Sequence, residues 1–175
     1  MKTYWLRKNI WLPQPRAKVF EFFANPGNLD RLTPAWLNFA ILTPSSNQIK
    51  QGALLDYKLR IRGIPIRWQS EIAVWEPPHR FVDRQTKGPY SLWVHEHTFE
   101  ECDNGTLVGD NVEYAVPGGS IVQKLLVAPD LERIFNYRHK ILQQLFNPTK
   151  IEPSQRSSAY SSDIAPFSSA ATRPM

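Results

Sequence analysis

The stretch "GPYSLWVHEHTFEE", residues 88–101, predicts a β-strand with two different faces. It opens on a Gly-Pro turn signal and then alternates, which places on one face Trp93, His95, His97 and Phe99. Such alternation is typical of a strand that turns one face to a core and the other to water. Two imidazoles on the apolar face need polar partners, because buried polar groups are normally hydrogen-bonded. The strand therefore indicates where a functional site could lie as well as how the chain folds.

Further strand patterns lie on both sides of this stretch. In chain order they are "TYWLRKNIWL" (3–12), "WLNFAIL" (36–42), "ALLDYKLRI" (53–61), "IPIRWQSEIAVW" (64–75), "RFVDRQ" (80–85) and "LVGDNVEYAV" (107–116). The "RG" at 62–63 and the "DNGT" at 103–106, with its Asn-Gly pair, predict tight hairpins. Because these connections are short, the strands should be neighbours in one antiparallel sheet. A bulge near Pro65 would exchange which of Trp68 and Glu71 faces inward, so the register stays open there.

Helical segments complete the pattern. "QPRAKVFEFFANP" (14–26) predicts a short helix and "PGNLDRLTP" (26–34) a second helical turn. "APDLERIFNYRHKILQQLF" (128–146) predicts a long helix, because apolar residues recur at helical spacing after Pro129. Roughly eighteen residues at about 1.5 Å each span about 27 Å, enough to cross a whole sheet. The sequence therefore predicts an α+β fold, in which a curved antiparallel sheet of about six to seven strands wraps on a long C-terminal helix.

Composition limits the class of protein. The chain of 175 residues is 42% hydrophobic and 12% aromatic, which suffices for one domain with a sizeable core. We expect this domain to span residues 1–147, and the Ser/Pro-rich residues 148–175 to be a disordered tail. The charge of +5 comes from scattered Lys and Arg, so we expect no nucleic-acid partner. A single cysteine, Cys102, excludes a disulfide within the chain, and neither a signal peptide nor a membrane span is predicted. We therefore expect a cytoplasmic protein.

Four segments of the predicted domain carry a family resemblance. They are "FEFFANPGNLDRLTPAWLNF" (20–39), "LRIRGIPIRWQSEIAVWEPPHRFVDRQTKGPYSLWVHEHTFEE" (59–101), "DNVEYAVPGG" (110–119) and "IFNYRHKIL" (134–142). They resemble the START-like helix-grip superfamily, also called SRPBCC, and especially its bacterial polyketide cyclase/dehydrase-like ligand-binding proteins. The resemblance implies a helix-grip fold with an internal cavity for a hydrophobic small molecule. It supplies no catalytic residues, because the superfamily includes transporters, sensors and cyclases.

The strand faces predict which side chains would line such a cavity. We expect a wall made of Tyr57, Leu59, Asp83, Trp93, His95, His97, Phe99, Asp110, Val112 and Tyr114, with Phe135 and Arg138 added from the long helix. The polar members could instead satisfy one another in a hydrogen-bonded core network. The candidate catalytic groups are His95, His97 and Asp110, because a neutral imidazole beside a carboxylate can transfer a proton near neutral pH.

A His-x-His pair on one strand also occurs in metal sites that a carboxylate and another histidine complete. His79 lies at a predicted turn and His139 on the long helix, and neither has an obvious route to the pair. Asp83 or Asp110 could still supply an oxygen ligand. On balance we expect no metal and no cofactor.

Three functions follow from these patterns. The first is binding or carrying of a hydrophobic small molecule, such as a lipid, polyketide or isoprenoid-like compound. The second is an enzyme of cyclase or dehydratase type that uses a cavity histidine as acid and base. The third is a protein-interaction module whose cavity is filled. Binding is favoured, because the sequence contains no nucleophile motif, phosphate-binding glycine loop or dinucleotide fingerprint. The identity of the ligand and the choice between monomer and dimer stay open.

Overall fold

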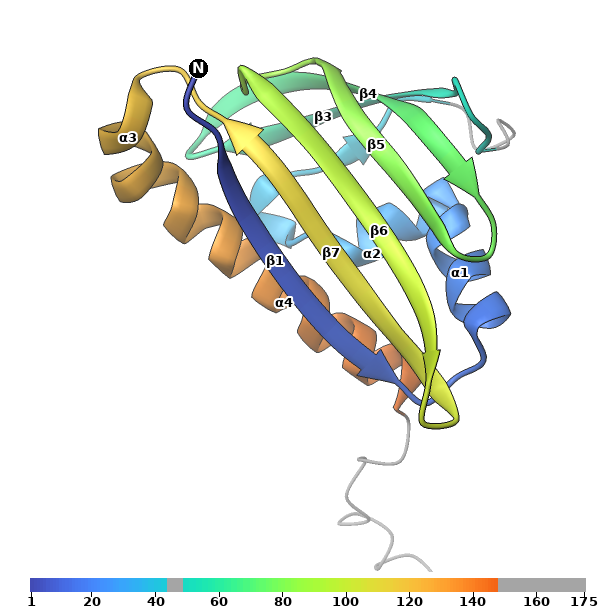
Figure 1. Ribbon diagram of the computed structural model, residues 1–175. Coiled ribbons are helices and arrows are strands. Elements are labelled where there is room, and N and C mark those ends of the chain that lie inside the picture. Colours follow the sequence, from blue (N-terminus) through green and yellow to red (C-terminus); the bar gives the residue numbers. More distant parts are fainter. Residues whose placement is uncertain (44–48, 148–175) are drawn as a thin grey trace, which may run out of the picture.

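A seven-stranded antiparallel sheet and one long helix form most of the structure (Figure 1), a computed structural model that describes residues 1–43 and 49–147. The strands are β1 (Tyr4–Leu12), β2 (Ala40–Ile41), β3 (Leu54–Ile61), β4 (Ile64–Glu76), β5 (Arg80–Lys87), β6 (Leu92–Cys102) and β7 (Gly105–Ala115). The helical segments are α1 (Arg16–Ala24), η1 (Pro26–Asn28), α2 (Leu29–Leu32), η2 (Ala35–Leu37), α3 (Gly119–Val122), the π-helical η3 (Gln123–Val127) and α4 (Ala128–Phe146). The predicted tail at 148–175 lies outside the described residues.

The strand order in the sheet is β1-β7-β6-β5-β4-β3-β2. From β2 to β7 each strand pairs with the next along the chain, and β1 joins the free edge of β7. α4 runs beside β1 and β7 on one face of the sheet (Figure 1), and residues of α1 and α2 pack on the same face. The predicted helix-grip architecture is therefore confirmed.

Two tight turns fix the register of the hairpins. In the β3–β4 turn, Arg62 and Gly63 both have a left-handed backbone (φ 50° and 83°), as this kind of two-residue turn requires. In the β6–β7 turn, Asp103 and Asn104 take these positions (φ 49° and 57°). The predicted Asn-Gly turn is therefore shifted by one residue. Gly105 instead begins β7, where a Cβ would lie 2.5 Å from a backbone oxygen of β1.

The predicted strand at 36–42 was mostly wrong. Only Ala40–Ile41 pair as β2, whereas Ala35–Leu37 form the 3-10 turn η2. Pro34 leads into this turn, and Asn38 ends it with a left-handed backbone (φ 43°). An extended strand cannot contain that backbone conformation, so the apolar run is divided between a turn and a short edge strand.

The register of β4 decides which of its side chains reach the interior. Trp68, Ser70 and Ile72 are buried, whereas Glu71 lies on the opposite face and forms an ion pair with Arg84 of β5 at 2.8 Å. The pairing of β4 with β5 is irregular between Gln69 and Ser70 and again between Ile72 and Val74. The register that the sequence left open thus places the tryptophan inside and the glutamate outside.

The apolar interior divides into two clusters on the helix-covered face of the sheet. The phenylalanine cluster consists of Ile10, Leu12, Val19, Phe20, Phe23, Leu32, Phe81, Phe99, Val108, Leu142 and Phe146. The tryptophan cluster consists of Leu6, Trp68, Trp93, Val112, Tyr114, Leu131 and Phe135. α4 contributes to both clusters, because its buried residues recur at the predicted helical spacing. Within residues 1–43 and 49–147, no helix combines the length and the apolar character that crossing a membrane requires.

Candidate functional site

A cavity of about 560 Å³ lies between the sheet and α4, on the side of the tryptophan cluster. Its volume falls in the range of sites for small organic ligands, about 300–1,000 Å³. Aromatic and aliphatic side chains from β3, β4, β6, α4 and the segment from α1 to η2 form most of the wall, among them Phe23, Leu32, Leu37, Leu55, Tyr57, Leu59, Ile61, Trp68, Ile72, Trp93, Leu131, Ile134 and Phe135. The cavity is therefore suited to an apolar molecule.

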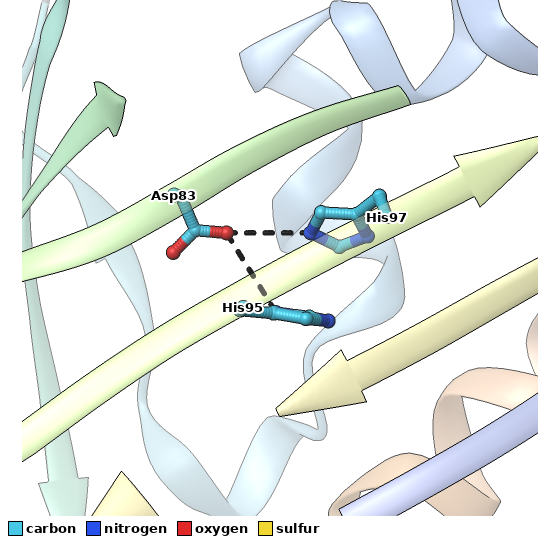
Figure 2. Close-up of side chains that lie close together, drawn as sticks. All are labelled: Asp83, His95 and His97. Atoms are coloured by element: carbon cyan, nitrogen blue, oxygen red, sulfur yellow. Dashed lines mark hydrogen bonds and ion pairs between the residues drawn. The ribbon is translucent and has the colours of Figure 1, made fainter. Parts of the chain in front are cut away.

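A polar cluster interrupts this wall on the sheet side (Figure 2). Strand pairing places Asp83 of β5 directly opposite His95 of β6, and His97 follows two residues later on the same face. The Oδ2 atom of Asp83 is 3.3 Å from Nε2 of His97 and 3.6 Å from Nδ1 of His95. Both histidines are buried, with 5% and 4% of their surface exposed. Three ionisable groups from two neighbouring strands thus converge at the edge of the cavity.

Asp110 of β7 is completely buried and supports the two histidines from outside the cavity lining. Its Oδ1 atom accepts a hydrogen bond from Nε2 of His95 at 2.9 Å and lies 3.2 Å from Nδ1 of His97. Arg138 of α4 approaches the same oxygen at 3.5 Å, and Nε2 of His139 lies 3.8 Å from Oδ2. α4 thus places His139 next to the carboxylate that holds the histidine pair, and not against the pair itself.

Burial and neighbouring charges shift the ionisation of this cluster. Burial alone would raise the pKa of Asp110, but the guanidinium of Arg138 and hydrogen bonds from the histidines hold that pKa well below its ordinary value. The pKa of Asp83 is lowered too, since the hydrogen bond from His97 and nearby positive charge outweigh the effect of burial. Burial, together with the neighbouring His97, lowers the pKa of His95 to about 4. At neutral pH the cluster therefore holds two carboxylates and a neutral His95.

A short hydrogen-bond chain connects Asp83 to the β3 side of the cavity. Ser70 Oγ donates to Oδ1 of Asp83 at 3.3 Å, and it lies 2.7 Å from the Tyr57 hydroxyl and 3.0 Å from the Trp68 indole nitrogen. Burial and the charge on Asp83 raise the pKa of Tyr57, so its hydroxyl stays protonated and can donate to Ser70. Ser70 did not figure among the predicted site residues. The alternation of Trp68, Ser70 and Ile72 would have indicated it once the register of β4 was known.

The predicted wall residues divide into two groups. Eight of them line the cavity: Tyr57, Leu59, Asp83, Trp93, His95, His97, Phe135 and Arg138. The other four, which lie outside the lining, are Phe99, Asp110, Val112 and Tyr114. Phe99 packs in the phenylalanine cluster because α1 covers that part of β6, and Val112 and Tyr114 pack in the tryptophan cluster. Contact of the eight lining residues with a ligand stays a prediction.

The family comparison and the solved structures agree with the fold described above. The profile of the family described as polyketide cyclase / dehydrase and lipid transport matches residues 12–137. The Zhui aromatase/cyclase from Streptomyces sp. R1128 is 14% identical with a TM-score of 0.65, and the match covers 83% of this chain and 94% of that one. No curated protein shows significant sequence similarity to the chain.

Two further solved structures are similar to the same extent. A protein from Chromobacterium violaceum is 14% identical with a TM-score of 0.65, over 82% of this chain and 97% of that chain. The ginseng major latex-like protein 151 from Panax ginseng is 13% identical with a TM-score of 0.63, also over 82% and 97%. At these identities the structural likeness concerns the fold alone.

Proposed function

The chain belongs to the polyketide cyclase / dehydrase and lipid transport family, within the START-like helix-grip superfamily, and from this premise we propose that it binds and carries a hydrophobic small molecule beneath α4. The ligand class is a lipid, polyketide or isoprenoid-like compound. The observation that carries the proposal is the cavity of about 560 Å³ with its mostly apolar wall. Protein interiors are otherwise packed with few voids larger than a water molecule, so a hollow of this size supports a ligand-binding role.

The polar cluster supports recognition of one polar group on that ligand. Asp83, His95 and His97 lie together on one wall, while aromatic and aliphatic side chains form most of the remainder. Small-molecule sites commonly combine an apolar lining with a few polar groups that orient the ligand. A molecule with an apolar body and a single hydroxyl or carbonyl group would place that group against the cluster.

Two exposed contacts hold α4 against the β3 side of the cavity. Arg62, in the β3–β4 turn, donates two hydrogen bonds to the Asp130 carboxylate at 2.8 and 3.1 Å. Further along α4, the Arg133 guanidinium lies over the Trp36 ring at 4.1 Å. All four residues line the cavity. Exposed ion pairs contribute little stability, so this edge can separate without unfolding the core and is the route by which a ligand enters.

Native mass spectrometry and thermal unfolding test this function. Freshly purified protein should retain an organic ligand, and added lipophilic compounds should raise the Tm, because binding to the folded state alone stabilises it. Leu59→Trp fills part of the cavity and should abolish the shift. Arg60→Trp, on the opposite face of the same strand, is the matched control and should preserve it. Equal shifts in the two variants would contradict the proposal.

A second function, catalysis of cyclase or dehydratase type, is favoured by the hydrogen bond between His95 and Asp110 beside the cavity. A neutral imidazole held by a carboxylate can accept a proton from a bound substrate. Replacing both His95 and His97 by Asn should then abolish turnover while ligand binding persists. If the protein is only a carrier, it has no turnover, and the double variant would then differ from the parent chain in no catalytic measurement. The third function, an interaction module with a filled interior, would need side chains in the space that the described residues leave open.

A further inference from the structure

The geometry of the polar cluster points to a binding site for a divalent transition-metal ion, with Asp83, His95 and His97 as its ligands (Figure 2). One ligand atom from each residue lies within 4.8 Å of the others. Oδ2 of Asp83 is 3.3 and 3.6 Å from the two facing nitrogens. Atoms bound to one ion at about 2.1 Å are themselves about 3.0–3.5 Å apart, so the two Asp83–histidine separations need little adjustment. The two histidine nitrogens lie within 4.8 Å of each other, and binding would draw them together. This site goes beyond the proposed carrier function and does not depend on it.

The hydrogen bond from His95 to Asp110 prepares the other imidazole nitrogen for metal binding. Nε2 carries the proton, because it donates to a carboxylate oxygen at 2.9 Å. A neutral imidazole has one N–H group, so Nδ1 of His95 keeps a lone pair. That lone pair faces Oδ2 of Asp83 at 3.6 Å, and this oxygen is an acceptor as well. Two acceptors without a proton between them repel each other, whereas a cation between them binds both.

His97 can present a second lone pair in the same direction. Without metal, its Nε2–H donates to Asp83 at 3.3 Å and its Nδ1 accepts from Arg138 at 3.4 Å. With the proton on Nδ1 instead, that nitrogen faces Oδ1 of Asp110 at 3.2 Å, and Nε2 is free to bind the ion. Asp110 then holds both imidazoles by their outer nitrogens. Metal-bound histidines almost always donate their other ring N–H to a carboxylate, a backbone carbonyl or water, and this bond fixes the orientation of the ring.

The charges of the cluster also favour a cation. The carboxyl groups of Asp83 and Asp110 lie on either side of the two histidines, and Arg138 is the one guanidinium within ion-pair distance of Asp110 among the described residues. In this part of the chain Oδ2 of Asp110 has no hydrogen-bond partner. Negative charge with little exposure to water is costly unless it is compensated. An ion bound by Asp83 would supply the missing positive charge.

The ligand set indicates the class of metal. Two imidazoles and one carboxylate suit zinc, iron(II) or cobalt(II), whereas calcium and magnesium prefer sites made of oxygen ligands. All three ligands line the cavity, so the open positions on the ion face the space where the carried molecule would lie. The sequence favoured no metal because neither His79 nor His139 offered a further nitrogen. The third ligand is instead the carboxylate of Asp83, which strand pairing places opposite His95.

Titration of the chelator-treated full-length chain with Co²⁺ and Zn²⁺ tests the site. Co²⁺ bound by nitrogen and oxygen ligands absorbs visible light, and Zn²⁺ should displace it with a stoichiometry of one ion per chain. Asp83→Asn and His97→Gln should each weaken binding at least tenfold. Asp110→Asn should weaken it by about 10–100-fold, as the loss of outer partners commonly does. His79→Asn, in the turn between β4 and β5, is the matched control and should bind as the parent chain does.

Two results would overturn the inference. One is a parent chain that gives no Co²⁺ spectrum. The other is a spectrum that stays unchanged in Asp83→Asn or in His97→Gln. These variants remove different ligands, so either one alone decides the question if circular dichroism shows that the other has not folded. The titration contains no lipophilic compound, so a failed metal site leaves the thermal-shift test of the carrier function unaffected, and the converse also holds.

Discussion

The phenylalanine cluster and the tryptophan cluster lie on the same face of one sheet, yet they meet the cavity differently: three of the eleven members of the first line it, against four of the seven members of the second. β6 passes through both: Phe99 lies in the first cluster and Trp93 in the second, with His95 and His97 between them. The alternation of β6 continues unchanged across this boundary. A single sequence pattern therefore builds a region that stabilises the fold and a region that can hold a ligand.

The difference arises from what covers the sheet. α1 brings Phe20 and Phe23 onto β6, where their ring centroids lie 5.2 and 5.1 Å from that of Phe99 in edge-to-face geometry. In the other cluster, Trp68 and Trp93 pack edge to face along the wall, 5.2 Å apart, and the space between them and α4 stays open. The helix after β1 thus fills one end, and the rings of the other end line the hollow without filling it.

The largest effect should come from removing a ring of the phenylalanine cluster. Phe99 is 1% exposed, so Phe99→Ala should lower the free energy of unfolding by about 3–5 kcal/mol. Leu59→Ala, at the half-buried cavity wall, should lower it by about 1 kcal/mol or less, because it only enlarges an existing space. Urea denaturation of both variants measures the contrast. Equal losses would show that the two ends are packed alike.

The next effect should come from the carboxylate at the boundary between the clusters. Asp110→Asn leaves the buried Arg138 without its ionic partner and should cost about 3 kcal/mol of unfolding free energy. Adding Arg138→Met to this variant should restore part of the loss, because an apolar side chain needs no partner there. Urea denaturation of the single and double variants provides the measurement. A double variant that is less stable than Asp110→Asn would argue against the ion pair as the cause.

The sequence predicts the sheet and the long helix well, because both have strong and uninterrupted periodicity. In β6 and α4 the buried positions follow the periods of a strand and a helix without exception among the residues that set the core. The prediction fails at 36–42, where a left-handed Asn38 divides an apolar run. It shifts by one residue at the β6–β7 turn, where close packing against β1 reserves Gly105 for the strand. Both features depend on contacts between segments distant in the chain, and the local sequence pattern does not reveal such contacts.

The site is predicted in part for the same reason. Alternation identifies Asp83, His95 and His97 as residues of one face, and the structure brings them together. It cannot show that α1 would cover Phe99, or that α4 would bring His139 to Asp110, because both depend on how the helices dock on the sheet. Strand pairing can be inferred from short connections, whereas helix docking requires the structure.

His95, at the boundary between the two clusters, should also make the metal-free protein sensitive to mild acid. The pKa of His95 is lowered from 6.5 to about 4, so the unfolded chain binds more protons between these values. Stability should therefore fall as the pH decreases from about 6.5 toward 4, by on the order of 3 kcal/mol, since one pKa unit corresponds to about 1.4 kcal/mol. The lowered pKa values of Asp83 and Asp110 act in the same direction, below about pH 4.

Urea denaturation in the presence of EDTA measures this dependence. The pH is varied between about 4.5 and 7, about the range in which an unperturbed histidine titrates. In His95→Gln the slope of stability against pH should become shallower, because the titrating group is gone. If His95→Gln has the same slope as the parent chain, the acid sensitivity comes from other groups and not from His95.

The smallest effect on stability should come from the polar contacts at the two edges of α4. These contacts can still show which edge opens to the cavity. At the β1 edge, Lys8 binds Glu132 and Asn136, and at the β3 edge Arg62 binds Asp130. Lys8→Ala and Arg62→Ala should each cost less than about 1 kcal/mol, because both pairs are partly exposed. Only the Arg62 pair lines the cavity, so only Arg62→Ala should speed the release of a fluorescent lipophilic probe in stopped-flow measurements. Equal acceleration in Lys8→Ala would mean that α4 lifts as a whole, and the β3 edge would then have no separate role as the route to the cavity.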